Sequence, residues 1–173
     1  ELFTDKTRSY TYLEDAYIGL VGGNVDADGN RLTYNFTAGR QRFTLANGFL
    51  IANTAANGDE RAALQANARW SSDLLVLGQI AYNDTKFEAF YVDPDELPIL
   101  DSDTKIAGLN LETKPLAGLT LGATYLTVPK SNTNYFSPTG TIAGGRENLE
   151  LWDARFTWQP NPTGAAGPFF GGE

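Results

Sequence analysis

The sequence predicts an all-β fold, an antiparallel transmembrane β-barrel, and three observations point to it. Apolar and polar residues alternate along most of the 173 residues, as they do in strands that keep one face away from water. The connections between these segments are alternately short and long, which is typical of a barrel with tight turns at one rim and loops at the other. The longest apolar run, 74–77, is much too short for a transmembrane helix of about 20 residues, whereas a transmembrane strand needs only about 9–11.

About seven strands are predicted, and their apolar residues recur with a period of two. The strands are 9–21, 31–43, 74–83, 85–93, 104–112, 119–130 and 147–158. Their apolar sides carry, in chain order, Ala16, Ile18 and Leu20; Leu32, Tyr34, Phe36 and Ala38; Leu74, Val76, Gly78, Ile80 and Tyr82; Phe87, Ala89 and Tyr91; Ala107, Leu109 and Leu111; Leu119, Leu121, Ala123 and Tyr125; Trp152, Ala154, Phe156 and Trp158. We expect these sides to face hydrocarbon.

The connections follow from the turn-forming residues. The apolar side changes from even to odd numbers between Tyr82 and Phe87, and the residues at 83–85 form turns readily, so a tight hairpin is predicted there. Short connections are predicted at 22–30, 83–85 and 113–118, and long ones at 44–73, 94–103 and 131–146. An odd number of strands cannot close a bacterial barrel of the usual even kind, and 159–173 lacks an amphipathic strand. The chain, 1–173, is therefore predicted to be one segment of a larger barrel.

The segment 44–73 is too long for a plain connection, and it has two interpretations. Its acidic start at Asp59 and Glu60, followed by alanines, favours a helix within a loop folded into the barrel. In that case Arg61 and Arg69 are expected beside the constriction. Residues 61–70 also alternate, so they are alternatively an eighth strand of a closed eight-stranded barrel.

Composition limits the function. The chain carries 13 basic and 21 acidic residues, a net charge of -8, so nucleic acid is not expected as a partner. It has no cysteine and no histidine, which removes thiol nucleophiles, disulfides and the commonest general base and metal ligand. We expect no enzyme activity, no metal site and no cofactor. The absence of methionine fits a mature or excised segment.

Two acidic segments have alternative interpretations. The segment 26–30 (DADGN) is similar to half of a calcium loop, or is a polar turn. The carboxylates at 93–103 are interpreted either as ligands for divalent cations or as part of a solvated loop. The second group comprises Asp93, Asp95, Glu96, Asp101 and Asp103.

Two stretches resemble bacterial outer-membrane porins, and most closely the alginate-export family. The sequence DAYIGL at 15–20 is followed by GRQRF at 39–43, and LANGFLI (45–51) and FEAFY (87–91) occupy the corresponding places. The resemblance covers roughly 12–130 and implies the N-terminal part of a wide channel in the outer membrane of a Gram-negative bacterium. Such a channel contacts lipid and lipopolysaccharide and passes small polar solutes or saccharides. The inward faces here are not arginine-rich, unlike those of the alginate exporter.

The polar sides of the strands give the residues expected to line the pore. They are Asp15, Tyr17, Asn35, Arg40, Gln41, Gln79, Lys86, Glu88, Asn110, Glu112, Asp153 and Arg155. Strict alternation places Arg40 on the lipid side, so either the strand has reached the rim there or a bulge at Gly39 turns Arg40 inward. The inward charges are mostly acidic, which predicts a weak cation preference. There are two alternatives to a channel: a small barrel acting as an adhesin or anchor, and a secreted carbohydrate-binding β-domain. The sequence does not predict the oligomeric state.

Overall fold

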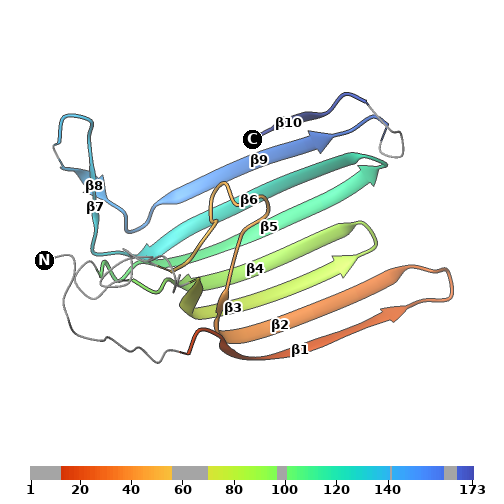
Figure 1. The fold of residues 1–173 in the computed structure, drawn as a ribbon, viewed down its shortest axis with the longest axis horizontal. Coiled ribbons are helices and arrows are strands. Elements are labelled where there is room, and N and C mark those ends of the chain that lie inside the picture. Colours follow the sequence, from red (N-terminus) through yellow and green to blue (C-terminus); the bar gives the residue numbers. More distant parts are fainter. Residues whose placement is uncertain (1–12, 56–69, 97–100, 141, 162–166) are drawn as a thin grey trace, which may run out of the picture.

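The computed structural model describes residues 13–55, 70–96, 101–140, 142–161 and 167–173, and these form an all-β, antiparallel structure (Figure 1). Eight strands make one sheet in the order β1-β2-β3-β4-β5-β6-β9-β10, and β7 and β8 form a separate hairpin. The strands are β1 (Ala16–Val25), β2 (Arg31–Arg42), β3 (Ser71–Tyr82), β4 (Thr85–Asp93), β5 (Lys105–Leu116), β6 (Leu119–Lys130), β7 (Asn134–Phe136), β8 (Ile142–Gly145), β9 (Glu150–Trp158) and β10 (Phe170–Gly172). The all-β antiparallel prediction is confirmed. None of the described residues forms a helix that could span a bilayer.

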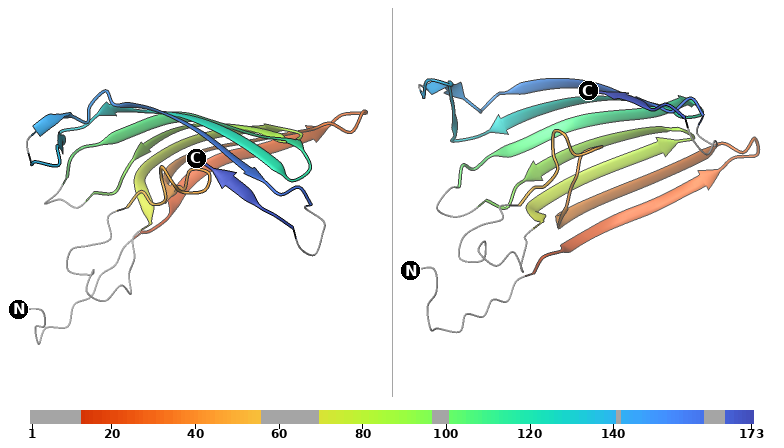
Figure 2. Two further views of the ribbon diagram at one scale, coloured as in Figure 1. Left: turned by 90° about the horizontal axis from the view of Figure 1, so that it is seen from above. Right: turned by 45° about the horizontal axis from the view of Figure 1, so that its top comes forward.

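The sheet is strongly curved and open, with β1 and β10 at its two edges (Figure 2). The sheet has eight strands where about seven were predicted, because β10 adds a strand within a segment expected to have none. This strand is only three residues long and pairs with the end of β9, where the Phe170 and Trp158 ring centroids lie 5.7 Å apart. The inference of a larger barrel from an odd number of strands therefore loses its premise.

The first strand lies later in the chain than predicted. The expected strand 9–21 is observed at Ala16–Val25, and residues 9–12 lie outside the described part of the chain. Gly22 and Gly23 were expected in the turn, but they belong to β1. The ring of Tyr34 lies over Gly22, where an added Cβ would meet the tyrosine oxygen at 2.3 Å. Gly22 therefore makes room for a cross-strand aromatic ring instead of forming a turn.

The alternation of short and long connections is confirmed. Tight connections join β1 to β2, β3 to β4 and β5 to β6 at one end of the sheet, and the long segments that follow β2, β4 and β6 lie at the other end (Figure 1). β9 ends and β10 begins at the end with the tight connections, with residues 159–169 between them. The hairpin predicted at 83–85 is present, with Asn83 at a positive φ of 50°. The predicted connection at 113–118 was too long, because β5 continues to Leu116. The predicted connection at 131–146 was too short, because β9 begins only at Glu150, and this segment contains the β7–β8 hairpin.

A hydrophobic core lies on the concave face, near the end with the long connections. Its loop residues Phe43, Leu45 and Ile51 belong to the segment after β2. They pack against the sheet residues Leu75, Phe90, Val92, Leu126 and Val128. Figure 2 shows this segment on the concave side of the sheet. Residues 44–55 thus lie over the concave face, whereas Arg61, Arg69 and the helix-or-strand question for 61–69 lie outside the described residues.

The convex face consists of the residues assigned to the apolar side of each strand. Strand register joins them laterally, for example Phe36 to Gly78, Ala89 to Leu109 and Leu121 to Phe156. Large apolar side chains stay exposed there, including Ile18 at 80 % and Trp152 at 77 %. The strands thus combine into one sheet with a continuous apolar face, which the sequence pattern predicted.

Candidate functional site

A row of polar residues crosses the concave face. Register places Asn35, Gln79, Glu88, Asn110, Thr124 and Asp153 side by side on six successive strands, β2 to β6 and β9. We call these six residues, with Arg155, the polar row. All of them except Thr124 were predicted as pore-lining residues from alternation. Only the register between strands, which alternation does not give, shows that they form one row.

Hydrogen bonds connect the row from end to end. Asn35 Nδ2 donates to Gln79 Oε1 at 2.9 Å, and Gln79 Nε2 donates to Glu88 Oε1 at 2.7 Å. The other oxygen of Glu88 accepts from Asn110 Nδ2 at 2.5 Å, and Asn110 Oδ1 accepts from Thr124 Oγ1 at 3.0 Å. Glu88, Asn110 and Thr124 are buried, and the row supplies partners for their polar atoms, as buried polar groups require.

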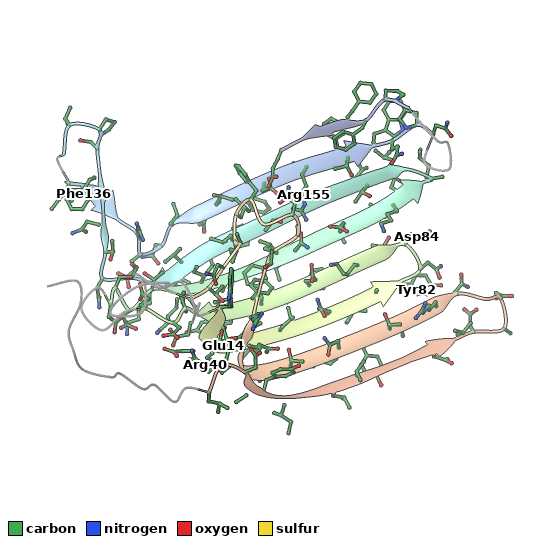
Figure 3. All side chains as sticks on the ribbon, viewed as in Figure 1. Glu14, Arg40, Tyr82, Asp84, Phe136 and Arg155 are labelled. Atoms are coloured by element: carbon green, nitrogen blue, oxygen red, sulfur yellow. The ribbon has the colours of Figure 1, made fainter. Side chains whose placement is uncertain are left out.

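Arg155 completes the row, and Gly122 makes its position possible. Its guanidinium donates to Thr124 Oγ1 and Asp153 Oδ2 at 2.8 Å each and to Asn110 Oδ1 at 2.6 Å. A Cβ added to Gly122 would lie 2.7 Å from Cζ of Arg155, so the guanidinium occupies the space that a side chain would fill. Arg155 therefore reaches from β9 across β6 to β5. Figure 3 shows Arg155 in this central part of the sheet.

The charges beside the row leave a small negative excess. Lys86 Nζ lies 3.2 Å from Glu88 Oε2, and Arg155 Nη2 lies 3.8 Å from Glu112 Oε2. Three carboxylates, Glu88, Glu112 and Asp153, therefore stand against the two cations. Lys86 and Glu112 are more exposed than the buried centre of the row and present their charges to the concave space.

Arg40 and Gln41 lie at the base of the long segment, away from the row. The register between β2 and β3 shifts between Gly39 and Gln41, and Gly39 has a φ of 136°. An irregularity was one of the two explanations offered for Arg40. Its guanidinium binds Asp73, and Asp95 at 2.5 Å. Gln41 is buried and donates to the Leu75 carbonyl at 3.3 Å.

Asp95 links Arg40 to the loop that covers the core. Its carboxylate is 4 % exposed and binds Arg40, while its backbone N–H donates to the Thr54 carbonyl at 2.9 Å. A bridge between Ala55 and Asp95 adds a second backbone contact. Arg40 therefore holds the end of the described loop segment close to the sheet.

Glu14 and Asp15 hold the start of β3. Glu14 Oε1 accepts from the N–H groups of Trp70 and Ser71 at 2.6 and 3.0 Å, and Asp15 Oδ1 accepts from Ser71 Oγ at 2.5 Å. Figure 3 shows Glu14 and Arg40 together at this end of the sheet. Tyr17 lies on the edge strand and is 59 % exposed. The roles of Glu14 and Asp95 were missed, because their partners lie 56 and 55 residues away in sequence.

The acidic turn 26–30 is occupied by its own hydrogen bonds. Asp26 Oδ1 accepts from the N–H groups of Asp28 and Asn30 at 2.9 and 2.8 Å, and Oδ2 accepts from Asn30 Nδ2 at 2.9 Å. The side-chain bond from Asn30, followed by the backbone bonds, holds the pKa of Asp26 below its usual value. The carboxylate thus stabilises a turn, as one interpretation expected.

Two of the five carboxylates at 93–103 pair with lysines at the ends of β5 and β6. Asp93 binds Lys105 at 2.6 Å, and Asp103 binds Lys105 at 3.0 Å and also Lys130. Hydrogen bonds from Lys130 and then Lys105 hold the pKa of Asp103 below its usual value. Glu96 accepts from Ser102 and Thr104 within the same loop. Among the described residues, no group of three acidic side chains is arranged to hold a metal ion.

Comparison of the chain with known protein families, curated proteins and solved structures gives no match. Function is therefore inferred from the fold and from the two faces of the sheet.

Proposed function

We propose that this chain forms part of an outer-membrane β-barrel channel that passes small polar solutes by diffusion. One observation carries the proposal: the curved sheet has a continuous exposed apolar face and, on its concave side, a continuous polar row. A transmembrane barrel needs this pairing, because its outer face meets hydrocarbon and its inner face meets water.

The apolar face supports a membrane environment. Contiguous apolar patches on soluble monomers are rarely larger than a few hundred Å². Here the exposed apolar residues extend from Ile18 and Leu20 on β1 to Phe156 on β9. Five strands, β1, β2, β3, β5 and β6, contain 10 or 12 residues, and β4 and β9 contain nine. These lengths are enough to cross a bilayer when the strands are tilted. Lipid and the acyl region of lipopolysaccharide are the partners that suit this face in a Gram-negative outer membrane.

The concave face supports a passage that selects without covalent chemistry. The loop segment 44–55 narrows the concave space, and its apolar side chains fix it to the sheet. Solutes would be selected by the width of this space and by its charge. The excess of one carboxylate beside the row favours cations weakly, and the pairing of Asp93 and Asp103 with lysines weakens the effect of the neighbouring loop.

The proposal requires closure of the sheet by strands added at β1 and β10. β1 is ten residues long and has a partner, β2, along one edge. An edge strand of this length and apolarity is prone to pair with another strand. Further strands of a longer polypeptide would complete the barrel in this way.

Electrical recording tests the function directly. The purified full-length protein is added to a planar lipid bilayer, and the current is recorded in symmetrical salt and then across a salt gradient. We expect stepwise increases in conductance and a reversal potential of the sign that indicates weak cation preference. Protein that inserts into the bilayer, shown by protection from protease, but gives no conductance steps would contradict the channel.

A small barrel serving as a membrane anchor is the second candidate, and the count of eight strands favours it. A barrel of eight strands has an interior just wide enough for side chains to fill. The dense hydrogen bonding of the polar row would suit such a filled interior. Membrane insertion without conductance is the outcome that this candidate predicts.

A further inference from the structure

A cavity lies on the concave face, between the loop, the polar row and β10. Its volume is about 620 Å³, within the range of about 300–1,000 Å³ that is common for small-molecule sites. Ala46 and Asn47 from the loop form one side, and Phe169 and Glu173 beside β10 form the other. Asn47 Nδ2 donates to Glu173 Oε2 at 2.6 Å, which connects the two sides.

The floor of the cavity carries groups of both charges and two hydroxyls. Arg155 and Glu112 line it, together with Thr120 and Thr157. The Arg155 side chain is only 10 % exposed and is fixed by its three hydrogen-bond acceptors in the polar row. Arg155 therefore provides a positioned, largely buried charge next to an accessible carboxylate, Glu112.

Mixed charge argues against a ligand with a net charge. An anion in this cavity would meet Glu112 and Glu173, and an organic cation would meet the guanidinium of Arg155. Hydroxyl groups both donate and accept, so a polyhydroxylated neutral molecule can satisfy carboxylate, guanidinium and threonine together. The charge pattern thus selects for a neutral, hydroxyl-rich ligand.

Phe169 adds an apolar surface to this polar site. Its side chain is 72 % exposed although it lines the cavity, so its ring is accessible to a ligand. The C–H face of a sugar ring is apolar, while its edge carries hydroxyls. A saccharide can therefore cover Phe169 with one face and hydrogen-bond to the floor with its edge.

We propose that this cavity is a weak binding site for uncharged saccharides, discriminating against uronates. The inference rests on the proposed function, since it names the class of solute that the concave face would favour. Polar groups of the ligand and of the cavity lose water on binding, and an open site replaces only part of the lost hydrogen bonds. Weak binding is therefore expected, with a Kd of about 1 mM. Such affinity suits passage, because tight binding would hold the solute in the channel.

Binding is measured without ion flow, by saturation-transfer NMR on the full-length folded protein in a detergent without a sugar headgroup. The probes are glucose, glucuronate and glucosamine. We expect saturable binding of glucose, with glucuronate about two- to five-fold weaker, the size of a screened charge interaction. Phe169→Ala should weaken glucose binding about two- to ten-fold, whereas the matched Phe136→Ala, on the distant β7, should not.

Glu112→Gln tests the selection by charge. It removes one carboxylate at constant shape, so it should reduce the difference between the affinities for glucose and glucuronate. Glu147→Gln, outside the cavity, makes the same change in net charge and should leave this difference in affinity unchanged. The fold of each variant is checked by circular dichroism before binding is measured.

Three results would overturn the inference: no saturable glucose binding, glucuronate or glucosamine binding more tightly than glucose, or glucose binding unaffected by Phe169→Ala. The two proposals fail separately. Conductance without saccharide binding removes this site and leaves the channel, whereas saccharide binding without conductance removes the channel and leaves the site.

Discussion

Replacing Gly122 by alanine tests whether Arg155 organises the concave face. Within β6, Gly122 lies directly under the guanidinium, and an added Cβ would be 2.7 Å from Cζ and Nε of Arg155. Carbon atoms do not approach so closely, so the guanidinium has to move. Its acceptors on Asn110, Thr124 and Asp153 would then lose hydrogen bonds that Arg155 now donates.

Gly122→Ala is expected to lower the free energy of unfolding, because Arg155 loses part of its hydrogen bonding. The higher preference of a strand for alanine than for glycine offsets part of this loss. A hydrogen bond to a charged group contributes about 1.5–3 kcal/mol to stability. Alanine in a strand is favoured over glycine by about 0.5–1 kcal/mol. Because a long side chain can relax and keep some of its bonds, we expect Gly122→Ala to lower the free energy of unfolding by about 1–2 kcal/mol.

The assay is reversible urea unfolding of the protein in lipid vesicles, followed by tryptophan fluorescence. A double-mutant cycle with Arg155→Ala isolates the contact, because the added methyl group has no guanidinium to displace in that background. Gly145→Ala is the matched control, since its nearest atom would be 3.8 Å from the new Cβ. It should change stability by no more than about 0.5 kcal/mol in either direction.

Additive effects in the cycle would refute this explanation. If Gly122→Ala costs the same with and without Arg155, the clash with the guanidinium is not the cause. A stabilising Gly122→Ala would show that the contact does not hold Arg155 in place.

Three further predictions follow from the two faces and the loops. Leu121→Lys should cost about 2–4 kcal/mol of stability in a bilayer, because position 121 lies on the apolar face, and an equal cost for Thr120→Lys would refute the assignment of faces. Substituting serine at both Leu45 and Ile51 should raise single-channel conductance by releasing the loop from the core, and an unchanged conductance would place the loop outside the passage. Asp103→Asn should lower stability at neutral pH. The pKa of Asp103 is lowered in the folded protein, so its stabilising effect is present above its unfolded pKa of about 3.9 and is lost as the pH falls through the folded value. The free energies of unfolding of wild type and variant should therefore converge in acid. A difference in stability that persists in acid would refute the lysine pairing.

Alternation predicted the faces well, because it depends only on neighbours in sequence. Each strand buries or exposes every second residue, so Glu88 and Asn110 were assigned correctly to one side and Phe87 and Leu109 to the other. The tight hairpin at 83–85 was also predictable from its turn residues and the change in parity.

The contacts between distant segments were not predictable in this way. The guanidinium of Arg155 occupies the space over Gly122 because the strand register places these two residues opposite each other, although they are 33 positions apart in the chain. A glycine among polar positions of a strand was the one available signal. Likewise, the ion pair between Arg40 and Asp95 could not be predicted, because it depends on where β4 and the loop lie relative to β2.

The ends of the strands were the least accurate part of the prediction. The turn pattern predicts that Gly22 belongs to a turn, whereas it lies within β1, where it leaves room for the ring of Tyr34. The short strand β10 has too few residues for alternation to be visible, and its position depends on pairing with β9. Local patterns are weakest where strand ends are set by cross-strand contacts.

The most direct test of the central claim compares water access at two adjacent positions in the middle of β2. The chain has no cysteine, so Asn35→Cys and Phe36→Cys each introduce a single thiol. Asn35 belongs to the polar row, and Phe36, 45 % exposed, lies on the apolar face. The full-length protein is placed in lipid vesicles and treated with a charged, membrane-impermeant thiol reagent.

We predict that the thiol at position 35 reacts and that the thiol at 36 is protected until the vesicles are dissolved and the protein is unfolded. A fluorophore attached at 36 should also be quenched by nitroxide groups on lipid chains, and one attached at 35 should not. Equal reactivity at the two positions in vesicles, with no quenching at 36, would contradict a sheet that faces lipid on one side and water on the other.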